Sequence, residues 1–315
     1  MDNFQLAKYE FVTQAKDELF VPRYMGSTLR GGFGHVFKRV VCLDFQKDCS
    51  DCILKYKCAY SYIFETPLPK DTEVLSKIPN IPRPFVLEPP LGGKTHYRPL
   101  DELRFGLVLI GKAIEFLPYF VFAFEELGTR GLGKERGRLN LLAIYSLRGE
   151  ERKQVYFGDS KTLNDDALIV RFHDLTKQEE TVQRIHIDFL TPTRIQKKKI
   201  ILRKIDFHSF IQNLLGRISM LSYFHCGAKL ELDFKGMLER AQTIKVENDQ
   251  LSWNSWTRYS SRQKRYMKWD GVIGGLDFVG QLNEFLPYIL LGEYVHIGKG
   301  TAFGLGHIAV QKNSR

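Results

Sequence analysis

The chain has 315 residues, 43% of them hydrophobic, and carries a formal net charge of +10 with a pI near 9.2. This length suits two domains of about 150 residues each, and the apolar fraction is enough for two cores. No apolar run approaches the ~20 residues that cross a bilayer, and the first ten residues lack the pattern of a secretory signal. We therefore expect a soluble, cytoplasmic protein with no membrane partner, whose charge favours an anionic one.

The first half of the chain predicts a strand, a helix, a strand, a helix and a closing strand. The first helix follows Gly26, and Ser27 or Thr28 can cap its N-terminus. Pro118 implies a kink or break in the second helix. A stretch at about residues 42–100 contains cysteines and many prolines, and we expect it to be an irregular insertion. The expected elements are strand Leu6–Ala15, helix Leu29–Val40, strand Leu103–Ile110, helix Lys112–Leu127 and strand Arg138–Ile144.

The second half predicts the same order of elements with one more strand. Val182–Leu190 alternates as a strand, with Ile185 and Phe189 on its buried face. A helical stripe then runs from Phe207 to Leu221. Next come two strand-like segments at about residues 266–279, a helix at Leu282–Tyr294 and a last strand at His307–Val310.

This order is that of the ferredoxin-like fold, βαββαβ, an antiparallel sheet with two helices on one face. We therefore predict an α+β protein with two tandem ferredoxin-like domains, residues 1–180 and 181–315. The boundary lies near the end of the charged and polar stretch Arg148–Gln183.

A short repeat supports the duplication. Glu115–Tyr119 and Glu284–Tyr288 both read EFLPY, and each precedes a Gly-Leu-Gly loop and an apolar strand pattern. Because the matches fall at the same place in each half, they indicate two copies of one unit.

The second loop, IGKGTAFGLGHIAV, is the first candidate for binding a phosphate. Glycines let a backbone approach a bulky anion and point its N–H groups outward, although glycine also serves ordinary turns. The candidate residues are Gly298, Lys299, Gly300, Gly304 and Gly306.

Two basic clusters in the second half indicate nucleic acid. From Arg184 to Arg315 there are 20 Lys and Arg and 11 Asp and Glu, so nearly the whole positive excess lies there. Basic side chains bind phosphates, while aromatic rings stack on unpaired bases. The alternative is a solvated basic face. The candidates are Arg258, Tyr259, Arg262, Lys264, Arg265 and Lys268 in one cluster, and Arg194, Lys197 and Lys198 in the other.

Taken together, these features resemble the RAMP superfamily of prokaryotic CRISPR-associated RNA-binding proteins, and within it the endoribonuclease that processes the CRISPR repeat transcript. The segments that carry the resemblance are spread over most of the chain: 26–35, the cysteine segment through Tyr62–Glu65, Arg258–Gln263 and Gly298–Gly306. It implies that CRISPR repeat RNA or crRNA is the partner, together with other CRISPR-associated effector subunits. It also implies a metal-independent cut by the 2′-OH, leaving a 2′,3′-cyclic phosphate.

The resemblance further implies a catalytic histidine near the first helix, with tyrosine and lysine assisting. His35 matches this position, Lys38 lies one turn away and Tyr24 is the nearest tyrosine, although the spacing of the last two departs from the expected triad. His296 and His307 flank the second glycine loop and are substitutes. The alternative for His35 is an exposed histidine without chemistry.

Four of the five cysteines lie close together in the sequence. Cys49, Cys52 and Cys58 follow the pattern C-x2-C-x5-C, and Cys42 precedes them by seven residues. Structural disulfides are unusual inside cells, whereas thiolates in such spacing bind zinc or an iron–sulfur cluster. The fourth ligand stays open, because Val40–Leu43 predicts a buried strand and Cys226 is distant. A structural zinc ion is therefore an alternative to ordinary packing cysteines.

Two other functions fit the same patterns. One is a non-catalytic RAMP subunit that only binds crRNA, and the other is a metal-containing adaptor whose basic face binds acidic proteins. The chain has no Walker loop, HExxH or Ser-His-Asp signature, which disfavours nucleotide hydrolysis and proteolysis.

Overall fold

The computed structural model describes residues 1, 3–68, 81–176, 181–197, 200–260 and 265–312. It divides into two compact units. The N-terminal unit is Phe4–Val170 with Met220–Gly227, and the C-terminal unit is Met1–Asn3, Arg171–Ser219 and Ala228–Arg315. The sequence placed the boundary ten residues later. No helix in the described ranges is long and apolar enough to span a membrane.

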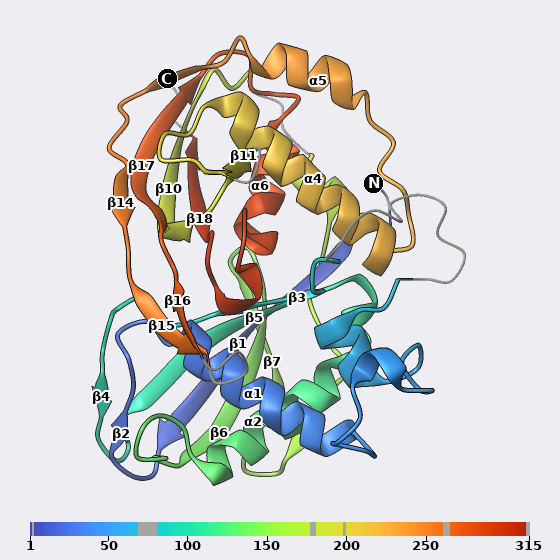
Figure 1. Ribbon diagram of the computed structural model, residues 1–315, viewed down its shortest axis with the longest axis vertical. Coiled ribbons are helices and arrows are strands. Elements are labelled where there is room, and N and C mark those ends of the chain that lie inside the picture. Colours follow the sequence, from blue (N-terminus) through green and yellow to red (C-terminus); the bar gives the residue numbers. More distant parts are fainter. Residues whose placement is uncertain (2, 69–80, 177–180, 198–199, 261–264, 313–315) are drawn as a thin grey trace. The chain divides into compact units, whose positions relative to one another are not determined.

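The N-terminal unit is an antiparallel sheet with two helices on one face (Figure 1). Four strands have the order β3-β5-β1-β6, and α1 and α2 connect them as in a ferredoxin-like fold. The sheet then continues through β7 and β8, while β9 pairs with β1. The bounds are β1 Gln5–Ala15, α1 Gly26–Val41, β3 Phe85–Glu88, β5 Glu102–Ile110, α2 Leu117–Arg130, β6 Leu139–Arg148, β7 Glu151–Phe157, β8 Thr162–Leu163 and β9 Ile169–Arg171.

Aromatic rings fill the layer between this sheet and its helices. Phe33 of α1 stacks on Phe120 and Phe124 of α2, with ring centroids 4.8 and 4.7 Å apart. Phe11 of β1 contacts Phe124 from the sheet side at 5.0 Å. The buried rings pack α1 against α2 and so fix the backbone positions from which the exposed side chains of both helices project.

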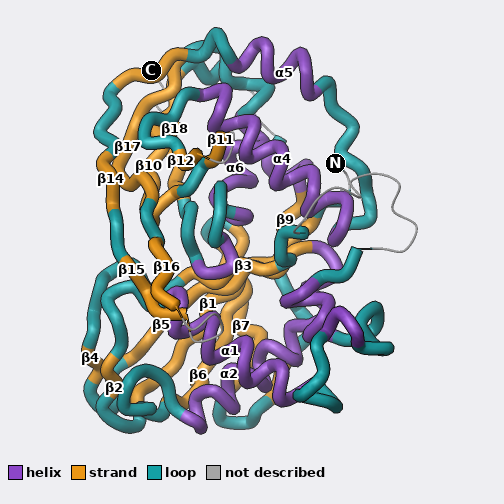
Figure 2. Tube along the Cα trace, viewed as in Figure 1, coloured by secondary structure: helices purple, strands orange, loops and turns teal. Residues whose placement is uncertain are grey.

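The C-terminal unit repeats this arrangement (Figure 2). Its sheet has the order β13-β17-β10-β18, β14 also pairs with β17, and α4 and α6 are the two connecting helices. The bounds are α3 Phe172–Leu175, β10 Arg184–Thr193, α4 Phe207–His225, α5 Phe234–Ala241, β13 Lys245–Glu247, β14 Ser252–Asn254, β17 Gly271–Val279, α6 Leu286–Val295 and β18 Ile308–Lys312.

Three two-stranded ribbons complete the described strands. They are β2 Leu19–Phe20 with β4 His96–Tyr97, β11 Gln196–Lys197 with β12 Ile200–Ile201, and β15 Thr257–Ser260 with β16 Arg265–Lys268.

The predicted α+β fold with two ferredoxin-like units is confirmed. Each EFLPY repeat begins a helix, because α2 starts at Leu117 and α6 at Leu286, with a proline in the first turn of both. Pro118 therefore starts a helix rather than kinking one, and a 3₁₀ turn, Gly111–Phe116, precedes it.

Two local predictions were wrong, and one strand lies where no element was predicted. Phe85–Glu88 was taken as irregular because prolines surround it, yet it is a buried strand paired with β5, since prolines next to a strand do not interrupt its ladder. The polar stretch after Arg148, for which no element was predicted, contains β7, which pairs with β6 and extends the sheet. The second strand of the C-terminal unit is β13 with β14, whereas the segment near Tyr266 forms the separate β15–β16 ribbon.

Candidate active site and nucleic-acid interface

His35 lies on the exposed face of α1, in the N-terminal unit. Partial burial, and the positive charges of Arg39, Arg130 and Arg136, lower the pKa of the His35 imidazole below its usual value. Arg39 is one turn further along α1, Arg130 ends α2, and Arg136 lies in the loop that follows. The imidazole is therefore mostly neutral at neutral pH and is surrounded by cations that suit a phosphate.

The first glycine loop fixes the position of Arg136. Gly131 has φ +82°, and a Cβ there would lie 2.0 Å from the Arg136 carbonyl oxygen. Leu132 forms a bridge with Gly137, which closes the loop. The close approach of the Arg136 carbonyl requires a glycine at position 131, and it places Arg136 beside the end of α2. Sequence reasoning missed Arg130 and Arg136, although the basic run around Gly131–Gly133 was a usable signal.

The structure does not assemble the expected triad around His35. The Lys38 ammonium lies over the rings of Phe45 and Tyr60, at 5.6 and 5.7 Å from their centroids, on the side of the cysteine segment. Tyr24 precedes α1, and nine residues of helix separate Gly26 from His35, a rise of about 14 Å. Burial raises the pKa of the Tyr24 hydroxyl, so it stays protonated.

The second glycine loop in the C-terminal unit is folded mainly on itself. The Gly304 amide donates to Thr301 and the Gly306 amide to Pro192, at 2.8 and 3.2 Å. A Cβ on Gly306 would lie 1.8 Å from the Ile297 carbonyl oxygen. Gly304 and Gly306 therefore shape the loop. Their amides are bonded within the protein, so the expectation that these N–H groups point outward to a phosphate was wrong.

Among the residues that the structure describes, the first arm of this loop has amides without an internal partner, of which those of Gly298 and Gly300 are half-buried and those of Thr301 and Ala302 belong to buried residues. In the described part of the chain, four of its amides have no hydrogen-bond acceptor: Gly298, Gly300, Thr301 and Ala302. Lys299 is exposed, and its amide donates to the Arg194 carbonyl at 3.3 Å. Such a run of N–H groups beside a lysine suits a phosphate oxygen.

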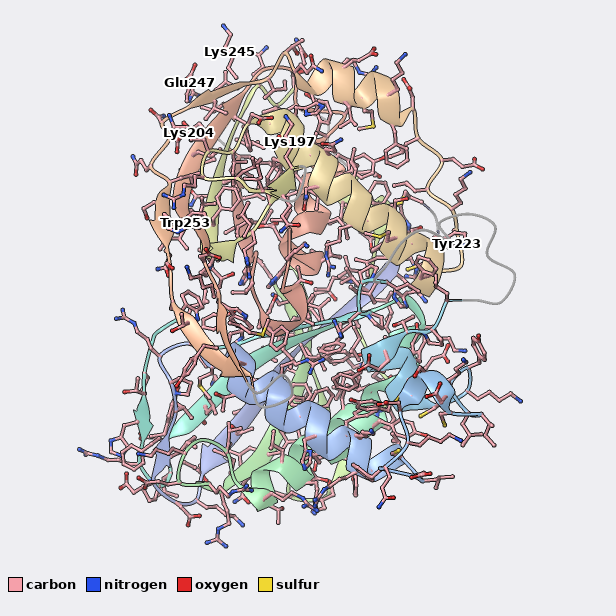
Figure 3. The ribbon with its side chains drawn as sticks, in the orientation of Figure 1. Lys197, Lys204, Tyr223, Lys245, Glu247 and Trp253 are labelled. Atoms are coloured by element: carbon pink, nitrogen blue, oxygen red, sulfur yellow. The ribbon has the colours of Figure 1, made fainter. Side chains whose placement is uncertain are left out.

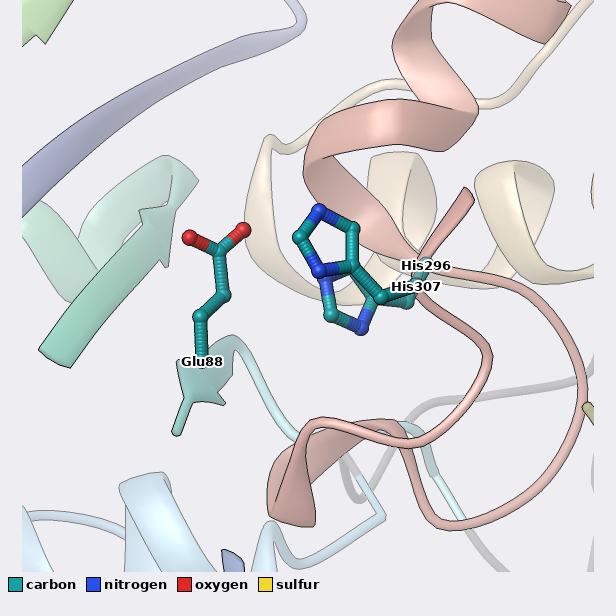
Figure 4. Close-up of side chains that lie close together, drawn as sticks. All are labelled: Glu88, His296 and His307. Atoms are coloured by element: carbon teal, nitrogen blue, oxygen red, sulfur yellow. The ribbon is translucent and has the colours of Figure 1, made fainter. Parts of the chain in front are cut away.

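His296 and His307 form a stacked pair at the ends of the loop (Figure 4). Their ring centroids are 4.5 Å apart and the rings are within 10° of parallel. The His296 Nδ1–H donates to the Leu305 carbonyl oxygen at 3.1 Å. Because His296 is fully buried, it serves the loop's structure.

The second basic cluster meets an aromatic side chain of the first. The Arg203 guanidinium lies over the Trp253 ring at 4.7 Å, which joins the connection before α4 to strand β14. Arg203, Lys197 and Lys204 are exposed, and Trp253 is half-buried (Figure 3). This Arg–Trp pair was not predicted, because its members are 50 residues apart in sequence.

The other predicted RNA-binding residues differ in role. Arg194 is largely structural, since its guanidinium donates to the Lys268 carbonyl at 3.2 Å and pairs with Asp270 at 3.4 Å. Lys268 is exposed on β16. In the β15–β16 ribbon, Arg258 pairs with Met267, Tyr259 with Tyr266, and Ser260 with Arg265. Lys198, Arg262 and Lys264 lie outside the described residues.

The cysteine segment follows α1 in the N-terminal unit. Val40 and Val41 end the helix and Cys42 caps its C-terminus, so the predicted buried strand there was wrong. Cys49, Cys52 and Cys58 lie in short turns beyond it and, like Cys42, are half-buried with free thiols. Among the described residues, no three cysteine sulfurs lie within 4.8 Å of one another.

Comparison with known proteins identifies the family. One family model, described as an N-terminal domain, matches residues 4–168, and another, CRISPR-associated endoribonuclease Cas6, matches residues 187–308. Residues 187–308 therefore match the Cas6 family. An uncharacterized protein of Archaeoglobus fulgidus is 23% identical over 309 residues, which cover 95% of this chain and 98% of that protein.

Solved Cas6 structures share the fold over nearly the whole chain. A Cas6 product complex matches with a TM-score of 0.61 and 14% identity, covering 98% of this chain and 99% of that one. Thermus thermophilus Cas6 matches with a TM-score of 0.57 and 15% identity at the same coverage. A partial Cas6-RT-Cas1–Cas2 complex matches with a TM-score of 0.61 and 12% identity, covering 98% of this chain and 46% of that one. At these identities the likeness establishes the shared Cas6 fold.

Proposed function

We propose that this protein binds CRISPR repeat RNA and cuts it at one site without a metal ion. The observation that carries the proposal is the exposed, mostly neutral His35 imidazole among Arg39, Arg130 and Arg136, on a Cas6 fold. The match of residues 187–308 to the Cas6 family supports RNA as the substrate, and solved relatives include a product complex and a substrate mimic complex.

The reaction is an internal transesterification. The 2′-oxygen attacks the adjacent phosphorus and loses its proton to a base, while the bond from phosphorus to the 5′-oxygen breaks and that oxygen gains a proton. The products are a 2′,3′-cyclic phosphate and a 5′-hydroxyl. A neutral imidazole can take the first proton, and arginine side chains stabilise the charge that grows on the phosphorane.

Binding would use the C-terminal unit as well. The free amides of Gly298 and Gly300 suit a backbone phosphate, and the Arg203–Trp253 pair suits an unpaired base next to a phosphate. Lys197 and Lys204 add positive charge around this pair. These groups contact phosphates and base faces and do not distinguish one base from another.

The test uses end-labelled repeat RNA with the wild type, His35→Ala and a control variant. His173 is also an exposed histidine on a short helix, so His173→Ala is the matched control. We expect His35→Ala to lower the single-turnover rate by about 10²–10⁴-fold while RNA affinity is kept. The wild type should cut in EDTA and leave a cyclic phosphate. Cutting of RNA with a single 2′-deoxy group at the site would contradict the mechanism.

A second function is supported by the positions of Lys38 and Tyr24. Because neither accompanies His35, the chain also fits a non-catalytic subunit that holds crRNA within a CRISPR effector complex. In that case wild type and His35→Ala would bind the RNA equally and neither would cut it. Co-purification with other CRISPR-associated subunits and crRNA would then identify the complex.

A further inference from the structure

The segment from residue 42 to 58 has an inverted pattern of exposure. All its apolar side chains face solvent, with Leu43 and Ile53 at 89% and 90% exposure. Phe45, Leu54 and Tyr56 are exposed as well. The residues that are not exposed are the four cysteines and Lys55. In a segment stabilised by hydrophobic packing, the leucine and isoleucine would be inside and the cysteines would be incidental.

The segment therefore lacks an apolar core of its own. Its only described helical turn is Cys49–Asp51, which buries no residue. A chain this long that buries no hydrophobic side chain needs another source of order, such as a covalent or metal crosslink.

The backbone places the four cysteines at the end of α1 and in the turns that follow it. Cys42 caps the C-terminus of α1, and the Cys52 amide donates to the Cys49 carbonyl at 3.4 Å, which forms a turn with two thiols three residues apart. The Cys58 amide donates to Leu54, and the Tyr62 amide donates to Cys58, so a helical segment starts at the last cysteine. The Cys42 thiol donates to the Asp44 carbonyl at 3.2 Å, so it is turned into the segment.

Positive charge adjoins the thiols. The Lys38 ammonium of α1 lies 5.6 Å from the ring centroid of Phe45, a residue of the segment. The Lys55 ammonium donates to the Ser50 carbonyl at 2.8 Å, inside the segment. Four thiolates and one divalent ion leave a net charge of −2, which two lysines can offset.

We propose that Cys42, Cys49, Cys52 and Cys58 bind one structural zinc ion in a closed four-thiolate site. The spacing matches that of structural zinc sites, and tetrahedral thiolate coordination suits zinc, which has no redox chemistry. Cys42 is the fourth ligand that the sequence left open, because the Cys226 thiol lies beside Gly111, outside the segment. Zinc binding draws the sulfurs together and orders the segment without hydrophobic packing. This site is independent of the proposed cleavage.

The experiment measures metal content in full-length protein purified without chelators. We expect about one zinc per chain by elemental mass spectrometry, falling to near zero in Cys52→Ser and Cys58→Ser. Cys226→Ser is the matched control, because this thiol lies outside the segment, and it should keep its zinc. Cobalt in place of zinc should give the intense charge-transfer absorption of tetrahedral thiolate ligation.

A second measurement covers variants that fail to fold. Titration of folded wild type with a mercurial should release the zinc as about four thiols react, and reduction should restore binding. Absence of metal, iron in place of zinc, disulfides between these cysteines, or zinc retained in both serine variants would each overturn the proposal.

Discussion

The two units share the same ferredoxin-like arrangement of strands and helices and differ in their glycine loops. In each, an EFLPY segment starts the second helix, which leads through a glycine loop to the last strand of a four-strand core. The N-terminal loop is short and positions Arg136 near His35. The C-terminal loop is longer, contains a stacked histidine pair, and has four free amides in its first arm. The duplicated glycines therefore encode a backbone shape, and function depends on the residues held by it.

The first prediction tests whether both loops need glycine for the same steric reason. Gly306→Ala would place a Cβ 1.8 Å from a carbonyl oxygen at φ +70°, so we expect a loss of about 3 kcal/mol or more in the C-terminal unit. All three tryptophans, Trp253, Trp256 and Trp269, lie in that unit, so their fluorescence in a denaturant titration reports its unfolding.

Two variants complete this test. Gly131→Ala would meet the Arg136 carbonyl at 2.0 Å, and it should destabilise the N-terminal unit, measured by circular dichroism. Gly216→Ala in α4 meets no atom within 4 Å and should stabilise its helix by up to about 1 kcal/mol. If Gly306→Ala unfolds like Gly216→Ala, the steric account of the loop is wrong.

The repeated arrangement could be read from the sequence because it depends on local patterns. Alternation in β10, the apolar stripe of α4 and the two EFLPY segments each report a local preference. Strand β3 could not be predicted, because four residues between prolines show no periodicity. Their burial comes from pairing with β5, in which Glu88 lies opposite Gly106. Strand β14 could not be predicted for the same reason, since it is a strand only through its pairing with β17.

The candidate site was only partly predictable. His35 came from a resemblance, whereas Arg130 and Arg136 reach it through the packing of α2 against α1, which no local pattern encodes. Lys38 was chosen by its helical spacing from His35, yet the ammonium turns toward Tyr60 because aromatic faces on the cysteine segment attract it. Spacing fixes which face a residue is on, and tertiary contacts decide where a long side chain ends.

The second prediction concerns the sheet faces away from the helices. There Glu10 pairs with Arg152 at 2.8 Å in the N-terminal unit, while the His186 imidazole pairs with Asp277 at 2.6 Å in the C-terminal unit. The hydrogen bond to Asp277 raises the pKa of His186. Hence the protonated form stabilises the fold, fully below its ordinary pKa of about 6.5, and this contribution is lost as pH rises through the raised pKa.

His186→Ala should therefore lower the stability of the C-terminal unit by about 1–2 kcal/mol at pH 6 and by less at pH 9. Asp277 does not limit this window, because burial would raise its pKa but hydrogen bonds from His186, Asn248 and Arg184 lower it on balance. Tryptophan fluorescence in urea measures both values. Glu10→Ala is the control; because Glu10 lies in the N-terminal unit, its effect is followed by circular dichroism, and it should be the same at both pH values. An equal loss at pH 6 and pH 9 would exclude a charged imidazole.

The third prediction separates the Arg203–Trp253 pair from general positive charge. Trp253→Ala should weaken binding of single-stranded repeat RNA by about 10-fold, because one base loses its stacking partner. Arg203→Ala should lower the slope of log affinity against log salt by about 1. Lys235→Ala on α5, 90% exposed, is the matched control and should do neither. If all three variants lost RNA affinity to the same extent, the Arg203–Trp253 pair would have no specific role and would only contribute to a general basic surface.

The fourth and smallest effect is on the pH dependence of cleavage. Partial burial and the charges of Arg39, Arg130 and Arg136 lower the pKa of His35, so the acidic limb of kcat/KM should lie below the ordinary histidine value near 6.5. Arg136→Gln removes one positive charge, which raises the His35 pKa and moves that limb to higher pH. Arg98→Gln, an exposed arginine outside this group, should leave the limb in place. Since neutral imidazole is the reactive base, a limb that moved to lower pH in Arg136→Gln would mean that another group accepts the proton.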